Sequence, residues 1–177
     1  MKQWIVIATL AGLAFAQPEF KGDKLVRPAN YREWIFLSSG LGMTYNGDTA
    51  SREPSFDNVF VDRAAYKSFM ETGVWPEKTM FVLEVRSSEA QGSINLGGHY
   101  QGSDFRLSAE VKESSRFKDK WEYFAFPASG EPAQALPRSA GCFACHSQHG
   151  AVENTFVQFY PTLLPVAKSK GTLKPGN

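Results

Sequence analysis

Residues Thr79–Arg86, with the sequence TMFVLEVR, carry the clearest structural signal in the chain. Neighbouring side chains on a β-strand point to opposite faces, so this segment divides its side chains into two sets. One set is Phe81, Leu83 and Val85, and the other is Met80, Val82 and Glu84. The segment therefore predicts a half-buried strand of an antiparallel sheet.

Four further runs are rich in the aromatic and β-branched residues that are typical of strands. They are Trp34–Leu37, Asn58–Val61, Phe105–Val111 and Trp121–Phe126. Glycine, serine and aspartate are frequent between the runs, and the long connection Ser38–Ser55 has the length of either an active loop or an ordinary surface loop. We therefore expect a mainly β, α+β fold with an antiparallel sheet and a few helices.

Helices are expected at three places. One begins after Asp62, a good N-cap, and ends at Gly73. A second, with Ser139 as a possible cap, precedes Gly150 in the C-terminal part of the chain. A third is predicted by the apolar stripe Val152, Phe156 and Tyr160, which Pro161 ends.

The sequence Cys142-Phe143-Ala144-Cys145-His146 occupies the second of these predicted helices. Two thiols three positions apart, followed directly by histidine, are the attachment signature of a c-type haem. A helical turn brings both sulfurs to the two vinyl groups of one porphyrin edge and leaves the imidazole beneath the iron. We expect one haem c, covalently bound through Cys142 and Cys145, with His146 as the metal ligand.

Three other uses of a cysteine pair are open. A structural zinc site needs four ligands, but the chain has only two cysteines, and His99 and His149 lack the spacing of a second ligand pair. A redox dithiol normally follows the first strand of a βαβ unit, which this sequence does not predict. A disulfide between residues three apart would close too small a loop to stabilise the fold much.

The N-terminus has the features of a secretory signal. Lys2 precedes an apolar stretch over residues 4–15, and Ala14-Phe15-Ala16 has the small-x-small form of a cleavage site. We therefore expect a signal peptide over residues 1–16 and a single haem domain over residues 17–177. The apolar stretch is too short for a membrane anchor, so we expect an exported, periplasmic protein without stable membrane insertion.

The charge of the chain excludes one class of partner. The full chain has 19 Lys and Arg residues against 18 Asp and Glu residues, and loss of the signal removes Lys2. A chain without an excess of positive charge has no electrostatic basis for binding nucleic acid. Lysines at 168, 170 and 174, beside glycine and proline, predict a solvated C-terminal tail.

Several separated blocks in one order resemble the cytochrome P-460 and cytochrome c′-β family. The blocks are residues 31–34 (YREW), 59–62 (VFVD), 72–84, 110–113 (EVKE), 116–117 (RF), 121, the haem motif and 155–161 (TFVQFYP). The resemblance covers residues 31–165. It implies a mainly antiparallel β domain with one c-type haem against the sheet, and it implies homodimers.

The resemblance implies one of two branches. In the P-460 branch a strand lysine is bonded to the porphyrin edge, and the enzyme oxidises hydroxylamine. In the c′-β branch this bond is missing, and apolar residues cover an open iron position that binds nitric oxide or carbon monoxide. Here Leu83 stands where the lysine would be, with Lys78 five residues earlier, and Ser108 stands where the enzymes have a glutamate, although Glu110 is two residues further on.

The predicted wall over the iron is formed by Phe56, Phe60, Phe81 and Leu83. Five other side chains are candidates for a sixth ligand: His99, His149, Met43, Met70 and Met80, of which Met80 and His99 are the best placed by sequence. The prediction is a cytochrome with a five-coordinate haem that binds nitric oxide or carbon monoxide, with a possible redox partner protein. A hydroxylamine-oxidising enzyme and a six-coordinate electron carrier are the alternatives.

Overall fold

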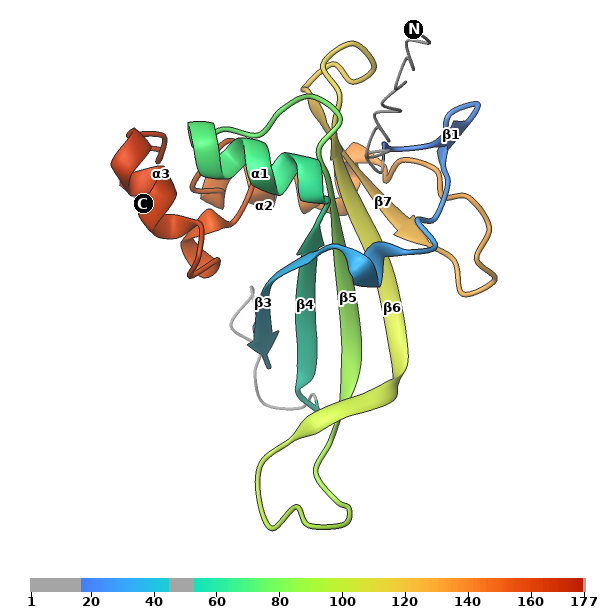
Figure 1. Ribbon diagram of the computed structural model, residues 1–177. Helices are drawn as coiled ribbons and strands as arrows, with labels where there is room; N and C mark the ends of the chain where they lie inside the picture. The colour runs from blue at the N-terminus through green and yellow to red at the C-terminus, as the bar shows by residue number, and fades with distance from the viewer. Residues whose placement is uncertain (1–16, 45–52, 177) are drawn as a thin grey trace, which may run out of the picture.

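The computed structural model describes residues 17–44 and 53–176, so the predicted signal over residues 1–16 lies outside the described part of the chain. A five-stranded antiparallel sheet forms its centre, in the order β3-β4-β5-β6-β7 (Figure 1). Its strands are β3 (Ile35–Leu41), β4 (Ser55–Val61), β5 (Met80–Glu89), β6 (Tyr100–Lys112) and β7 (Trp121–Phe126). The prediction of a mainly β fold with an antiparallel sheet is confirmed.

Smaller elements cover the two faces of this sheet. A short N-terminal hairpin is formed by β1 (Phe20–Lys21) and β2 (Lys24–Leu25). The α-helices are α1 (Arg63–Thr72), α2 (Cys142–His149) and α3 (Leu164–Lys170), and the short 3-10 helices are η1 (Tyr31–Glu33), η2 (Arg138–Ala140) and η3 (Val157–Phe159). None of the described helices has the length and apolar character needed to cross a membrane.

Side chains along β5 alternate between the two faces of the sheet, and a hydrophobic core lies on each face. Phe81 packs on one face with residues of α1, α3 and the segment around η3. Met80 and Val82 pack on the other face with the N-terminal segment and residues of β6 and β7. Figure 1 shows the three α-helices gathered around one end of the sheet, while the β5–β6 hairpin projects from the other end.

Helix α1 has the boundaries that its capping residues predict. The Asp62 side chain accepts a hydrogen bond from the Ala65 N–H at 2.8 Å, and Gly73 ends the helix with a φ of 76°. The other Asp62 oxygen accepts from the Met80 N–H at 3.2 Å, which joins the helix to the start of β5. A side chain at Gly73 would collide with Lys170, so α3 packs directly against this end of α1.

Two details of the helical prediction are wrong. Helix α2 begins after Gly141, and no side chain caps it, so Ser139 is not its cap. Residues 152–160 contain a tight turn and η3 in place of a helix, because Glu153 adopts a left-handed φ of 51° that interrupts helical geometry. In the C-terminal segment, Lys168 and Lys170 are exposed, as expected of solvated residues, but they belong to α3, which Leu163 and Ala167 attach to the first core.

Candidate haem site

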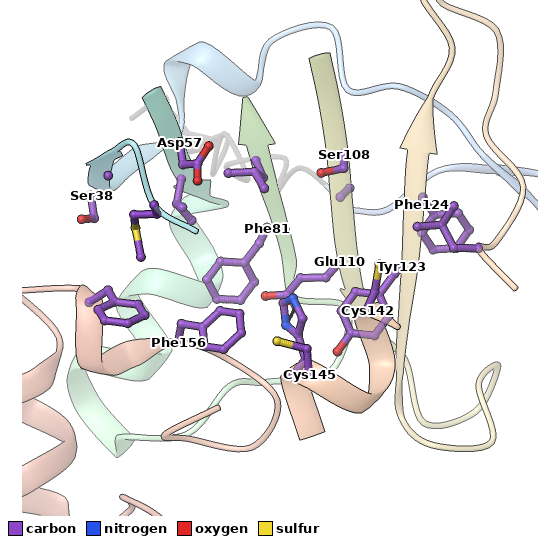
Figure 2. Close-up of a pocket in the computed structure, with 18 of the residues that line it drawn as sticks. Ser38, Asp57, Phe81, Ser108, Glu110, Tyr123, Phe124, Cys142, Cys145 and Phe156 are labelled. Carbon is purple, nitrogen blue, oxygen red and sulfur yellow. Dashed lines mark ion pairs between the residues drawn. The ribbon is translucent and has the colours of Figure 1, made fainter. Parts of the chain in front are cut away.

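A cavity of about 390 Å³ lies between α2 and one face of the sheet. Its volume is in the usual range for sites that bind small molecules and cofactors. The wall is mostly apolar, and the sheet contributes Ser38, Gly40, Asp57, Val59, Phe81, Leu83, Ser108, Glu110 and Tyr123. Met43 and the C-terminal Phe156, Phe159 and Tyr160 also line the cavity. Of these, Phe156 is labelled in Figure 2, where it lies near Phe81.

Helix α2 brings the three residues of the haem motif to this cavity together. Positions three and four apart share one face of an α-helix, so Cys142, Cys145 and His146 all lie on the side that faces the sheet. Both cysteines are free thiols and are partly exposed. This is the state from which thioether bonds to a porphyrin form.

The hydrogen bond of His146 fixes which ring nitrogen is available to a metal. Its Nδ1 lies 2.8 Å from the carbonyl oxygen of Asn154. A carbonyl only accepts, so Nδ1 carries the hydrogen and Nε2 keeps its lone pair. The ring is held between Tyr123 and Phe156, with centroid separations of 4.6 and 4.4 Å. This is the arrangement expected of a metal-binding histidine, whose second nitrogen is oriented by a backbone carbonyl.

Glu110 places a buried carboxylate beside the same imidazole. Its Oε2 lies 3.0 Å from Nδ1 of His146, but this oxygen has no hydrogen-bond partner among the described residues. Burial is the largest single effect and would lower the pKa of His146, but the Glu110 carboxylate and the Asn154 carbonyl together outweigh it, so the pKa of His146 is raised. A neutral ring is the form that binds a metal, so metal binding competes with protonation of this imidazole.

The sheet wall combines apolar and polar side chains. Phe81 and Leu83 line it from β5, and Leu83 lies opposite Val59 on one side and Ser108 on the other. Asp57 adds a carboxylate whose pKa is raised by burial, against the opposing effect of Arg106. The wall is therefore apolar where Phe81 and Leu83 lie and polar towards β3 and the helix.

Phe60 and Phe56 do not line the cavity. In the register of β4 with β5, Phe60 lies opposite Val82 and Phe56 opposite Arg86, so both belong to the other face of the sheet. Phe60 packs there against Tyr31, with ring centroids 5.7 Å apart. The prediction of these two residues as cavity wall is corrected, and Val59 and Asp57 take their places on β4.

The candidate sixth ligands are widely separated in the structure. Met80 is buried in the second core, and His99 is bonded to Ser88 in the projecting hairpin, so neither lines the cavity. Met70 is exposed on α1, and His149 is outside the cavity lining at the end of α2. Met43 does line the cavity. Lys78, the lysine nearest in sequence to Leu83, is exposed in the turn before β5 and does not line it.

Sequence reasoning missed several side chains that line the cavity. Tyr123 could have been found, because alternation along Trp121–Phe126 places it on the same face as Trp121. Burial, with the Glu110 carboxylate nearby, raises the pKa of Tyr123, so the phenol stays protonated. Phe156 was assigned to the stripe of a helix that does not form, and neither it nor Phe159 could be placed in the cavity, because the turn and 3-10 helix that hold them follow no regular period.

These residues fit a c-type haem. One helix face presents two thiols and an imidazole with a free Nε2, and the cavity in front of them is large and mostly apolar. A porphyrin would be held by the thiols at its edge and by the imidazole at its iron, with Phe81 and Leu83 against the macrocycle. The cavity therefore has both the donor groups and the apolar surface that this cofactor needs.

Comparison with known proteins agrees with this site. The family model of Cytochrome P460 matches residues 28–157, from the segment before η1 to the beginning of η3. The matched region includes α2 and every strand of the five-stranded sheet. No curated protein matches the chain. The chain therefore belongs to the cytochrome P460 family of haem proteins.

Proposed function

We propose that this protein is an exported, periplasmic cytochrome that binds nitric oxide or carbon monoxide at an open axial position of one haem c. In this proposal Cys142 and Cys145 attach the haem and His146 is its proximal ligand. Scavenging, storage or sensing of nitric oxide would each use such a site. The proposal includes a homodimer, as the family resemblance implies, and a redox partner that sets the oxidation state.

The observation that carries the proposal is the side chain at position 83. Leu83 lines the cavity, and no lysine is among the described residues that line it. An aliphatic side chain has no amine with which to form the porphyrin cross-link of the hydroxylamine-oxidising branch. Lys78 is exposed outside the cavity. This distribution favours the c′-β branch.

The apolar wall supplies the selectivity in this proposal. When bound, the haem iron supplies one open coordination position for a small ligand. Val59, Phe81 and Leu83 present no hydrogen-bond donor there, so polar bound dioxygen gains no stabilisation from them, whereas nitric oxide and carbon monoxide depend less on a donor. Selectivity for the two gases follows from this wall.

A second candidate function is hydroxylamine oxidation, for which the sequence left Glu110 as a candidate base. Its buried carboxylate does line the cavity, but Oε2 of Glu110 lies 3.0 Å from Nδ1 of His146. Nδ1 points away from an iron held at Nε2, so this carboxylate lies on the proximal side, whereas a substrate would bind on the opposite side of the iron. The enzyme hypothesis therefore does not find its base in Glu110, and it lacks a candidate cross-linking lysine in the described cavity wall.

Covalent attachment is tested by a double variant. We expect Cys142→Ala with Cys145→Ala to abolish haem staining of the protein on a denaturing gel, because the chain contains no other thiol. The unmodified protein should stain. Haem that remains bound through denaturation in the double variant would refute the assignment of these cysteines.

The branch is tested on the unmodified protein. We expect peptide mass mapping to find the mass of the motif peptide plus one haem, without a lysine-containing partner peptide. Hydroxylamine oxidation should not exceed the rate without protein. A Lys78–haem peptide together with hydroxylamine turnover would move the protein to the enzyme branch.

A further inference from the structure

The turn that follows α2 is buried and tightly built. The Gly150 N–H donates to the His146 carbonyl at 2.9 Å, and the Ala151 N–H donates to the Thr155 carbonyl at 2.8 Å. Ala151, Val152 and Thr155 are almost completely buried. This turn carries Asn154, whose carbonyl accepts the hydrogen bond from Nδ1 of His146. The position of the turn therefore determines the position of that acceptor.

Glu153 ties the turn to the sheet. One of its carboxylate oxygens lies 2.6 Å from Nζ of Lys112, and the other accepts from Nε1 of Trp121 at 2.9 Å. Lys112 also donates to the carbonyl of Trp75 at 2.7 Å. We call Glu153, Lys112 and Trp121 the Glu153 clamp. The clamp joins β6 and β7 to the residue that precedes Asn154.

The clamp matters because Nδ1 of His146 has two acceptors within reach but only one hydrogen. The Asn154 carbonyl is at 2.8 Å and takes it, whereas Oε2 of Glu110 is at 3.0 Å and has no hydrogen bond among the described residues. A neutral carbonyl and a carboxylate affect an iron-bound imidazole differently. A carboxylate acceptor makes the imidazole a stronger electron donor to the metal.

We propose that the Glu153 clamp holds the Asn154 carbonyl in place as the acceptor for His146, and so keeps the Glu110 carboxylate from taking this hydrogen bond. Glu153, Lys112 and Trp121 are then positioning residues that set how strongly the proximal imidazole donates to the iron. The inference rests on the proposed role of His146 as proximal ligand. It goes beyond that role, because the clamp influences the reduction potential of the iron and the strength of the iron–histidine bond.

The first test is Glu153→Gln in the haem-loaded protein. Loosening the turn should let Glu110 accept the hydrogen bond, which strengthens the iron–histidine bond and stabilises ferric iron. We expect the iron–histidine band in the resonance Raman spectrum of the ferrous protein to move to higher frequency. Loss of the hydrogen-bond partner of a metal ligand commonly changes metal affinity or activity about tenfold or more, and a tenfold change in the reduction equilibrium is about 59 mV for one electron. The potential should fall by about this amount.

The direction of this change separates the proposal from simple electrostatics. Removal of the negative charge of Glu153 would by itself raise the potential, because it disfavours ferric iron. Trp121→Phe removes one hydrogen bond of the clamp without any change in charge, and it should lower the potential by a smaller amount. It also provides the decisive measurement if Glu153→Gln does not fold.

A double variant shows whether the effect passes through Glu110. In the Glu110→Gln background there is no carboxylate to take the hydrogen bond, so adding Glu153→Gln should not lower the potential or raise the Raman frequency. Glu84→Gln is the matched control, because Glu84 forms a buried ion pair on the opposite face of the sheet. It should reduce stability and leave the iron–histidine band unchanged.

Two results would overturn the proposal. One is an unchanged band and potential in both Glu153→Gln and Trp121→Phe. The other is an equal decrease in the reduction potential when Glu153→Gln is made in the wild type and in the Glu110→Gln background, which would mean that the turn affects the iron by another route. A wild-type protein that is five-coordinate and high-spin in the ferrous state but shows no iron–histidine band would refute His146 as the proximal ligand, and the clamp would fail with it. That result is distinct from an unchanged band in the variants.

Discussion

Met80 and Leu83 are three residues apart on β5, yet they belong to different parts of the molecule. Met80 is buried in the second core beside Val82 and Val111. Leu83 lines the cavity on the opposite face. The period of two along a strand separates them, so the sulfur of Met80 cannot reach an iron bound by His146 without turning the strand over.

Met80→Ala should therefore behave as a core variant. Deletion of a buried methionine side chain typically costs about 2–5 kcal/mol of the free energy of unfolding, because it leaves a cavity. We expect this loss in urea unfolding, with no change in the spin state of the haem. Met70→Ala, at a residue that is 41% exposed on α1, is the control and should cost much less. A change in spin state in Met80→Ala alone would contradict the placement of Met80.

Glu84 should make the stability of the protein depend on pH. Burial would raise its pKa, but hydrogen bonds from Arg86, Tyr31 and Arg32 outweigh burial, so the pKa of Glu84 is lowered from 4.5. Because the pKa is lower in the folded state, the carboxylate stabilises the fold at pH values above the pKa that Glu84 has in the unfolded chain. This stabilisation is lost as the pH falls through the pKa of Glu84 in the folded protein.

We expect the urea concentration at the unfolding midpoint of the wild type to decrease as the pH is lowered from neutral to below about 4. In Glu84→Gln the midpoint should start lower and fall less over the same range, because the amide does not titrate. Parallel curves for the two proteins would show that Glu84 is not a source of the acid sensitivity.

At the scale of elements, α2 and the turn after it form one packed unit. A Cβ atom at Gly150 would lie 2.7 Å from both the carbonyl carbon of Asn154 and the carbonyl oxygen of His146. These atoms are backbone and cannot move aside without displacing the turn. The φ of Gly150 is –64°, so the conformation itself suits alanine and only the collision opposes it.

Gly150→Ala should cost about 1–3 kcal/mol in the free energy of unfolding, which is typical of overpacking at a tight contact. Thermal or urea unfolding measures the loss. Gly97→Ala is a matched control, because a Cβ there meets no atom within 4 Å. A Gly150→Ala protein as stable as the control would mean that the turn is not packed against α2 as described.

The elements also show what sequence could predict. All five runs predicted as strands are strands, and Asp62 and Gly73 bound α1, because period and capping are local properties. Which side chains of different strands lie on the same face of the sheet is not a local property. Phe60 was predicted to share a face with Leu83, but the register pairs Leu83 with Val59, and a shift of one residue reverses the face.

At the scale of the whole molecule, the motif Cys142–His146 predicted the haem but not the surroundings of its cavity. Asp57, Tyr123 and Phe156 come from separate parts of the chain, and only strand register and the irregular turn after α2 bring them together. The Glu153 clamp likewise depends on a left-handed residue that no helical or strand pattern indicates. Local pattern therefore predicts the cofactor, and tertiary packing determines its environment.

The central claim is that His146 is the one protein ligand of the iron, and that no other side chain lining the described cavity, Met43 included, occupies the opposite position. The absorption spectrum of the ferrous protein, recorded before and after addition of carbon monoxide, tests this most directly. We predict a high-spin, five-coordinate spectrum that carbon monoxide converts completely without displacing a side chain. A low-spin ferrous spectrum without added ligand, or the spectrum of a cross-linked porphyrin, would contradict the claim.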